Sequence, residues 1–321
     1  MLLLLYFEER CDIGLQQKGD TVVKIFSAII SSMRDFRLKL LVSGYRVYFH
    51  ALALLSDERA ANAALDRFSR PKSRKRRSLQ LPIFKDAEWA HLQTPTGKLA
   101  HYHWAGSGHM TVLFAHGWES DAGTFGPMVE HMLSKGYSVR ALDAPAHGMS
   151  EGKKLNLLEY ARAIHLLVRE SGDVSLCVGH SFGGMATALA SSFDKEAFPP
   201  SALVASAVEL RRSMETYFKM LQFSEKMQSA ISEAVERKHR KPISWFSLPR
   251  MIEEAKHPFL LIHDMDDKVC PLDDLQGLMD ASPAHARFRI TRGHGHRRIL
   301  REKSIWEEIL QFAEDSRESL P

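Results

Sequence analysis

Hydrophobic residues from about residue 90 onward occur in short runs, and longer amphipathic segments separate them. Around Pro95-Thr96-Gly97 apolar and polar residues alternate with a period of two, which predicts an antiparallel hairpin. Later runs are apolar throughout, so we expect strands that are buried on both faces of a mostly parallel sheet. The runs are 111–116, 137–143, 174–179, 201–206, 258–263 and 286–291, and helix-like segments lie near 124–135, 155–171, 183–193, 271–280 and 302–314.

The region before this alternation is helical in pattern. From about Val22 to Phe68 it predicts two or three helices, with Asp57 or Ser56 as a helix cap and Pro71 as a stop. The apolar faces fit two interpretations: packing on the main domain, which we favour, or contact with a lipid bilayer. They comprise Phe26, Ile29, Ile30, Met33, Leu41, Tyr45, Tyr48, Phe49 and Leu52.

Charge is concentrated in one place. The chain carries 43 Lys and Arg against 39 Asp and Glu, and six of the basic residues lie between Arg70 and Arg77. The other 37 basic residues are outnumbered by the acidic ones, so the fold has no general basic character. No aromatic residue interrupts the tract, which favours a solvated linker and predicts no nucleic-acid partner.

Composition narrows the class further. The 321 residues are 45% hydrophobic and 26% charged, which indicates a globular protein, and no apolar run reaches the roughly 18 residues of a membrane span. Three scattered cysteines form no CxxC pair, so we predict neither a disulfide framework nor a zinc site. Met1–Tyr6 lacks the basic residue of a signal peptide, and we therefore expect a cytoplasmic location.

The most informative motif is Gly179-His180-Ser181-Phe182-Gly183, a G-x-S-x-G between a predicted strand and a predicted helix. A side chain at Gly179 or Gly183 would collide with the adjoining strand and helix, because the turn is tight. Such a turn presents the Ser181 hydroxyl at the helix N-terminus. There the Phe182 backbone N–H and the helix dipole can stabilise an oxyanion.

These motifs make residues from about 90 to 315 resemble the α/β hydrolases, a superfamily of esterases, lipases, thioesterases and peptidases. His116-Gly117-Trp118 resembles the H-G-x loop, which implies that the Trp118 N–H is the second oxyanion donor. Asp143 to Ser150 resembles the turn D-x-x-G-x-G-x-S, with Ala146 where glycine is usual. We expect Asp143 to hold backbone N–H groups, and we expect His116, His147 and His180 to shape their turns.

The resemblance also implies an acid and a base, because a serine hydroxyl is a weak nucleophile. Counting from His263 places the acid at Asp267, with Asp266 as the adjacent alternative and Asp264 where glycine is usual. In Gly293-His294-Gly295-His296 the base is His296, with His294 as the alternative. Two histidines at this spacing are weak evidence for a metal, and we predict neither a metal nor a cofactor.

The resulting expectation is an α/β-hydrolase fold in three parts. Residues 1–80 form a helical extension and basic linker, 81–206 and 258–321 form the core, and 207–257 form a helical lid. Serine at position 181 excludes dehalogenase and epoxide hydrolase chemistry, which need aspartate there. We expect a carboxylic ester hydrolase acting on a small ester or thioester.

The lid stripe indicates an apolar acyl group if it faces the substrate, but it is equally typical of a helix core. Its residues are Met214, Tyr217, Phe218, Met220, Leu221, Phe223 and Met227. Two alternatives to an enzyme remain open: a non-catalytic binding protein on the same fold, and a membrane-associated protein that makes weak contacts through its N-terminal helices. The sequence leaves the oligomeric state undetermined.

Overall fold

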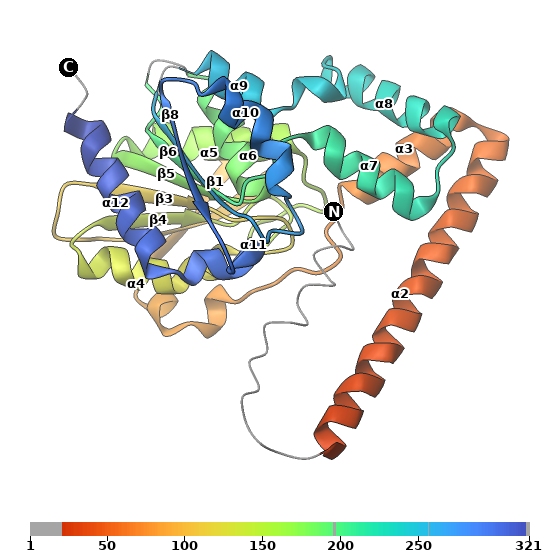
Figure 1. The fold of residues 1–321 in the computed structure, drawn as a ribbon, viewed down its shortest axis with the longest axis horizontal. Helices are drawn as coiled ribbons and strands as arrows, with labels where there is room; N and C mark the ends of the chain where they lie inside the picture. The colour runs from red at the N-terminus through yellow and green to blue at the C-terminus, as the bar shows by residue number, and fades with distance from the viewer. Residues whose placement is uncertain (1–20, 195–196, 256, 319–321) are drawn as a thin grey trace. The chain divides into compact units, whose positions relative to one another are not determined.

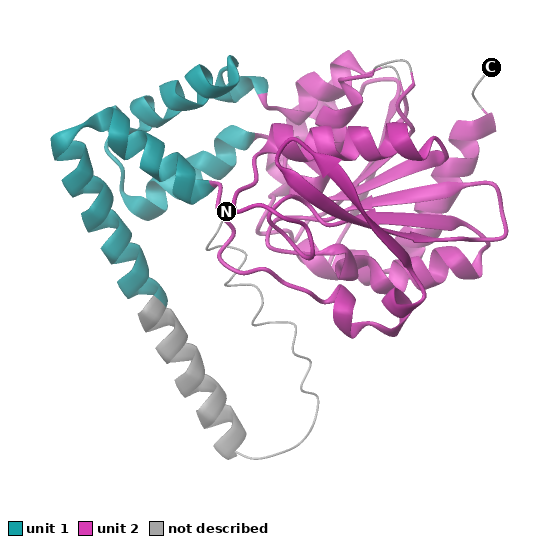
Figure 2. Ribbon diagram, turned by 180° about the vertical axis from the view of Figure 1, so that it is seen from behind, with its two compact units in different colours: residues 1–68, 210–245 teal, residues 69–209, 246–321 magenta. Residues whose placement is uncertain are grey.

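The computed structural model describes residues 21–194, 197–255 and 257–318, and it describes side chains from residue 38 onward. Met1–Tyr6, Cys11 and the predicted apolar face at Phe26, Ile29, Ile30 and Met33 therefore lie outside the described side chains. The chain divides into two compact units (Figure 2). Unit 1 is 1–68 with 210–245, and unit 2 is 69–209 with 246–321.

Unit 2 is built on one eight-stranded sheet with the strand order β1-β2-β4-β3-β5-β6-β7-β8. The strands β3 to β8 are parallel to one another, and β2 runs antiparallel to both of its neighbours, β1 and β4. This confirms the predicted mostly parallel sheet, and each predicted run coincides with one strand to within two residues at either end. The strands are β1 (Glu88–Thr94), β2 (Gly97–Trp104), β3 (Thr111–Ala115), β4 (Ser138–Leu142), β5 (Val174–His180), β6 (Ser201–Val204), β7 (Phe259–Asp264) and β8 (Ala286–Thr291).

Helices cover both faces of this sheet (Figure 1). Side chains of α4 and α12 share one apolar core with alternate residues of the strands, among them Phe114, Val178 and Ile262. Helices α5 and α6 pack together and lie on the strands as the other layer. The unit contains α4 (Gly126–Ser134), α5 (Leu157–Ser171), α6 (Phe182–Ser191), α9 (Leu248–Glu254), α10 (Gln276–Ala281), α11 (Gly295–Arg298) and α12 (Lys303–Glu318), with short 3-10 turns.

The hairpin and the basic tract also belong to unit 2. Thr94 pairs with Gly97 at the turn, as the alternating pattern predicts. Within the tract, the guanidinium of Arg74 donates to the carbonyl oxygens of Ser150 and Gly152 at 2.8 and 2.7 Å. The buried carboxylate of Asp121 accepts the backbone N–H groups that end the tract. The tract is thus attached to the core at specific points, which a freely solvated linker would not be.

Unit 1 is all helical. It comprises α2 (Thr21–Leu55), α3 (Asp57–Phe68), α7 (Leu210–Leu221), α8 (Glu225–His239) and a 3-10 turn at Ile243–Trp245. The cap of α3 is Ser56, whose Oγ accepts the Arg59 N–H at 3.3 Å. Two helices thus occupy the region where the sequence predicts two or three.

The apolar stripe of the inserted segment lies inside unit 1. It spans two helices, because α7 ends at Leu221 and Ser224 caps α8. Tyr217 is 2% exposed, and its hydroxyl donates to the Ala64 carbonyl in α3 at 3.0 Å. Phe223 meets Phe49 of α2 edge to face at 5.6 Å. The stripe is therefore helix core, and it carries no information about the polarity of an acyl group.

Candidate active site

Ser181 is the single residue between β5, which ends at His180, and α6, which begins at Phe182. Its backbone has φ 54° and ψ −120°, a conformation that a residue with a side chain rarely adopts. The turn is held by the Ser181 N–H, which donates to the Val204 carbonyl of β6 at 3.0 Å. The strained conformation turns the serine out of both the strand and the helix, as the motif predicts.

Three glycines allow neighbouring chain segments to approach this turn. A Cβ at Gly179 would lie 2.6 Å from Gly184 Cα, and one at Gly183 would lie 2.3 Å from the Ala115 carbonyl. Both predicted collisions are therefore confirmed. A Cβ at Gly117 would lie 3.0 Å from Ser181 Cβ, which shows how closely the loop after β3 passes the serine. Any side chain at these positions would push the loop, the strand end and the helix apart.

The structure brings Ser181, His296 and Asp267 together in one chain of hydrogen bonds. His296 Nε2 lies 3.0 Å from Ser181 Oγ, and His296 Nδ1 lies 2.8 Å from Asp267 Oδ2. All three residues are at most 4% exposed. The ionised carboxylate can only accept, so the proton of the neutral imidazole resides on Nδ1. Nε2 is then free to accept the serine proton.

Asp267 is fixed by its own loop. Its Oδ1 accepts the backbone N–H groups of Val269 and Cys270 at 2.8 and 2.9 Å. Burial raises the pKa of this carboxyl, but the hydrogen bond from His296, the imidazole charge and the backbone donors outweigh burial. The pKa of Asp267 is thus held below its usual value, and the group stays ionised at neutral pH.

Two further acidic residues of this loop hold the turn that carries His296. Asp264 accepts the backbone N–H of Gly295 at 2.9 Å, the N–H of His294 at 3.1 Å and the Thr291 hydroxyl at 2.7 Å. Asp266 accepts the Gly293 N–H at 2.9 Å. Sequence reasoning took Asp266 as the alternative acid and Asp264 as a departure from the usual glycine, and it missed their positioning role. The signal was present as three acidic residues within four positions at the end of β7, Asp264 to Asp267.

The two alternative assignments separate clearly in space. His294 is half-buried, and its Nδ1 lies 3.8 Å from Glu302 Oε2. Of these two histidines, His296 is the one hydrogen-bonded to the Ser181 hydroxyl. His180, next to the serine, donates from Nε2 to the His296 carbonyl at 2.9 Å. Burial, aided by the nearby His296, lowers the pKa of His180 to about 3, so this ring stays neutral and supports the turn.

Two backbone N–H groups, those of Phe182 and Trp118, are the oxyanion donors that the motifs predict. Phe182 is the first residue of α6, and its N–H therefore has no acceptor within the helix. Trp118 follows Gly117, and its ring meets Phe182 edge to face at 5.7 Å, with both side chains buried. Among the described residues, two buried atoms here have no hydrogen-bond partner: Trp118 Nε1 and His180 Nδ1.

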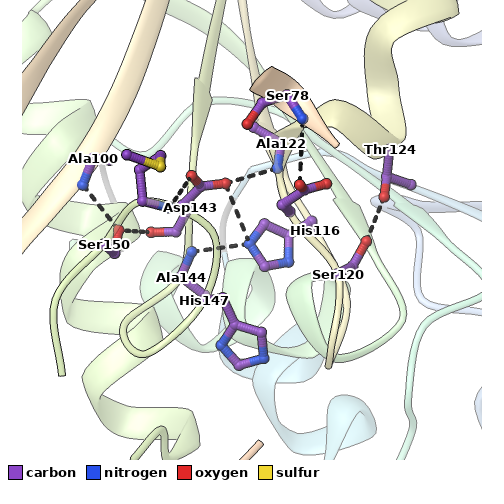
Figure 3. A network of polar contacts seen from close by, with 12 residues as sticks. Ser78, Ala100, His116, Ser120, Ala122, Thr124, Asp143, Ala144, His147 and Ser150 are labelled. Atoms are coloured by element: carbon purple, nitrogen blue, oxygen red, sulfur yellow. Dashed lines mark hydrogen bonds and ion pairs between the residues drawn. The ribbon is translucent and has the colours of Figure 1, made fainter. Parts of the chain in front are cut away.

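A second buried carboxylate lies at the end of β4, within the network of Figure 3. Asp143 accepts the backbone N–H groups of Ala122 and Met149, each at 2.8 Å, and the Tyr102 hydroxyl at 3.0 Å. This confirms the predicted role of Asp143 as a holder of backbone N–H groups. His116 Nε2 accepts the Ala144 N–H at 2.9 Å, and so this imidazole is also structural.

The described residues include no cluster of three His, Cys, Asp or Glu side chains able to hold a metal ion. The arrangement around Ser181 needs none for its own chemistry. It offers a serine hydroxyl on an imidazole that a carboxylate holds, and the Phe182 N–H group at the N-terminus of α6. Such a set can attack an electron-poor carbonyl and stabilise the oxyanion that forms.

Comparisons with known proteins agree with the fold. The family model described as serine aminopeptidase, S33, matches residues 106–253, whereas a search of the curated proteins finds no match. An esterase from Pyrococcus furiosus is 19% identical, with a TM-score of 0.54 over 76% of this chain and 97% of its own. Mouse alpha/beta hydrolase domain-containing protein 10 is 17% identical, with a TM-score of 0.53 over 73% and 100%.

A thioesterase domain from the curacin biosynthetic pathway is also similar in structure. It is 18% identical, with a TM-score of 0.52 over 70% of this chain and 99% of that domain. Likeness at this level of identity shows a shared fold. These structures therefore confirm the predicted fold, and the family match over residues 106–253 agrees with the superfamily that the motifs resemble.

Proposed function

On the premise that the chain is an α/β hydrolase, we propose that it cleaves a small carboxylic ester or thioester with Ser181 as nucleophile, His296 as base and Asp267 as the acid that orients the base. One observation carries the proposal. A buried serine, histidine and aspartate from three different strand ends form a continuous chain of hydrogen bonds of 3.0 and 2.8 Å. Stability alone would not require an aspartate, a histidine and a serine to be linked in this sequence, with the imidazole donating to the carboxylate and accepting from the serine hydroxyl.

The first half of the proposed reaction acylates the enzyme. His296 Nε2 takes the hydroxyl proton while Ser181 Oγ attacks the carbonyl carbon, and Asp267 stabilises the imidazolium that forms. The carbonyl oxygen becomes an oxyanion, which accepts from the N–H groups of Phe182 and Trp118. The tetrahedral intermediate then collapses, His296 gives its proton to the leaving alcohol or thiol, and an acyl ester remains on Ser181.

The second half repeats these steps with water as the nucleophile. His296 removes a proton from water, and the hydroxide that attacks generates a second tetrahedral intermediate at the same oxyanion donors. Ser181 leaves with the proton returned by His296. The products are a carboxylic acid and the free enzyme, so no cofactor is consumed.

Peptide hydrolysis is the second candidate, because the matching family model is described as a serine aminopeptidase. The same triad serves both reactions, and the leaving group decides between them. We favour esters and thioesters, because the solved structures of similar fold include an esterase and a thioesterase domain.

Three coarser expectations accompany the proposal. We propose that the helices inserted between β6 and β7 act as a lid; the ends of the insertion are joined by a hydrogen bond of 2.7 Å from the Leu248 N–H to the Val208 carbonyl. We propose a cytoplasmic location, which suits the two described cysteines, Cys177 and Cys270, because both are free thiols. The partner is a small molecule.

The test is turnover of p-nitrophenyl esters from acetate to decanoate, of the matching acyl thioesters, and of aminoacyl p-nitroanilides. We expect ester and thioester hydrolysis by the wild type and a loss of at least about 10³-fold in kcat/KM for His296→Ala. His294→Ala is the matched control, because this neighbouring histidine does not contact Ser181, and its activity should stay within about threefold of the wild type.

Two outcomes would contradict the proposal. Faster cleavage of the anilides than of the esters would favour the peptidase. An absence of turnover of every substrate by a folded sample would favour a binding protein built on the same fold.

A further inference from the structure

The C-terminal half of α2 presents three distinct faces. Apolar and small residues form one exposed stripe, which continues for about 22 Å along the helix. Leu54, Leu55 and Val47 are 89%, 80% and 70% exposed, far above what a core helix shows. The exposed stripe consists of Leu40, Leu41, Gly44, Val47, Tyr48, Ala51, Leu54 and Leu55.

The opposite face of the same helix is already occupied within unit 1. Phe49 is 1% exposed and packs against Phe223. The Arg46 guanidinium donates twice to the Met220 carbonyl of α7, at 2.7 and 3.0 Å. These contacts fix which side of α2 faces outward. The contacts within unit 1 therefore determine that the exposed stripe faces outward.

Charge points to the kind of partner that fits the exposed stripe. By sequence, α2 carries Lys24, Arg34, Arg37, Lys39 and Arg46 but only one acidic residue, Asp35. Lys39, Ser43 and His50 form an exposed polar border along one side of the exposed stripe. An apolar stripe on a helix with five cations and one anion matches an anionic lipid surface, because acyl chains take the leucines and headgroups take the cations.

The helix is also apolar enough to cross a bilayer. The 18 residues Leu38–Leu55 have a mean hydropathy of 1.2, and 6% of them are buried. Two observations argue against spanning. Arg46 lies at the middle of this window, where a charge is most costly in hydrocarbon. One face of the window is also packed against the other helices of unit 1, which a bilayer would have to replace.

We propose that α2 lies in the plane of an anionic membrane surface, with the exposed stripe in the acyl-chain boundary and its basic residues at the headgroups. Unit 1 is then a membrane anchor. The proposal is independent of the chemistry at Ser181, because none of the residues of the exposed stripe belongs to that site.

The experiment uses the full-length protein and sedimentation with preformed vesicles. One set contains phosphatidylcholine with about one third phosphatidylglycerol, and the other contains phosphatidylcholine alone. We expect binding to the anionic vesicles, weaker binding to the neutral ones, and release as salt rises from about 0.1 to about 0.5 M. A spanning helix would not be released by salt.

The decisive variant is Leu40→Gln/Val47→Gln/Leu54→Gln, which makes the exposed stripe polar at three positions without touching the packed face. We expect its partition onto anionic vesicles to fall at least about tenfold, because three apolar side chains lose their burial in lipid. Ser43→Gln/His50→Gln is the matched control on the polar border and should bind like the wild type. Circular dichroism and hydrolysis of a soluble ester check that both variants are folded.

The remaining outcomes overturn the proposal. Equal vesicle binding by the triple variant would show that other residues, such as the tract 70–77, hold the protein on the membrane. Failure of the wild type to bind either kind of vesicle would show that the exposed stripe does not bind a membrane. If sedimentation equilibrium without lipid then gave a dimer that the triple variant abolished, the exposed stripe would be a contact between two copies of the chain.

Discussion

Two buried aspartates at strand ends of unit 2 differ in what surrounds them. Asp143, after β4, has its Oδ1 4.0 Å from Nε2 of His116. Asp267, after β7, has its Oδ2 2.8 Å from Nδ1 of His296. Both carboxylates are buried, and both accept backbone N–H groups. Burial and a nearby histidine are thus common to the structural pair and to the proposed catalytic pair.

The difference lies in where each imidazole directs its hydrogen bonds. His116 Nε2 is occupied by the Ala144 N–H, and its Nδ1 donates to the Gly117 carbonyl at 2.7 Å, so it has no lone pair left for proton transfer. His296 donates to Asp267 and has Nε2 on a serine hydroxyl. The direction of hydrogen bonds therefore separates a base from a structural ring.

The largest effect should come from replacing each aspartate by asparagine. Asp267→Asn is expected to lower kcat/KM for p-nitrophenyl acetate by about 10⁴-fold, because the amide favours the wrong tautomer of His296. Asp143→Asn should keep kcat/KM within about threefold and lower the free energy of unfolding by about 1–3 kcal/mol. Steady-state kinetics and urea unfolding measure both. Similar losses of activity in the two variants would contradict the distinction.

The turn around Asp143 should be sensitive to one methyl group. At Gly148, where φ is +47°, a Cβ would lie 2.1 Å from the Asp143 carboxylate. We expect Gly148→Ala to lower the free energy of unfolding by about 3 kcal/mol or more. Gly277→Ala is the control, because nothing lies within 4 Å of that position in α10. A helical alanine there should stabilise the protein by about 0.5–1 kcal/mol.

A histidine of the structural type should also make stability depend on pH. His147 Nε2 accepts the Glu119 N–H at 3.0 Å, and burial lowers its pKa from 6.5 to about 3. The unfolded chain binds this proton more tightly, so stability is full above pH 6.5 and falls as pH decreases toward 3.

His147→Gln should remove one such contribution. Between pH 6 and pH 4.5, the free energy of unfolding should fall less steeply in this variant than in the wild type, by up to about 1.4 kcal/mol per pH unit. Urea unfolding at several pH values measures the slopes. Parallel curves for the two proteins would show that His147 is not held neutral by burial.

The smallest effect concerns the carboxylates that hold the His296 turn. Asp264→Asn removes the carboxylate that accepts hydrogen bonds from Gly295, His294 and Thr291. These donors lower the pKa of Asp264 by more than burial raises it. We expect kcat to fall about tenfold with KM unchanged, because the imidazole is displaced. Asp266→Asn, which loses one N–H contact, should cost less than about threefold. The reverse order would contradict the positioning role.

Much of this molecule is readable from its sequence. Buried strands such as Phe259–Asp264 are apolar throughout, so both the strand and its burial follow from the pattern. The tight turn at Ser181 is predicted by Gly179 and Gly183, because a side chain at either position would collide with neighbouring chain segments. What the sequence leaves open depends on tertiary contacts: the roles of Asp264 and Asp266 appear only when β7 and β8 lie side by side.

The stripe from Met214 to Met227 shows the same limit. A buried helix core and a lid that faces a substrate have the same spacing, and only the contacts of Tyr217 and Phe223 with α2 and α3 distinguish them. The exposed stripe of α2 was hidden for a related reason. In the C-terminal half of α2 apolar residues lie on several faces of the helix. The sequence alone therefore does not distinguish the face that packs within unit 1 from the face that is exposed.

The most direct test of the central claim is intact-mass spectrometry after incubation with a fluorophosphonate, which reacts only with an activated serine. We predict one covalent adduct on the wild type, located at Ser181, and none on Ser181→Ala or His296→Ala. An adduct that persists in Ser181→Ala, or a folded wild type that remains unlabelled, would contradict the assignment of Ser181 as the nucleophile.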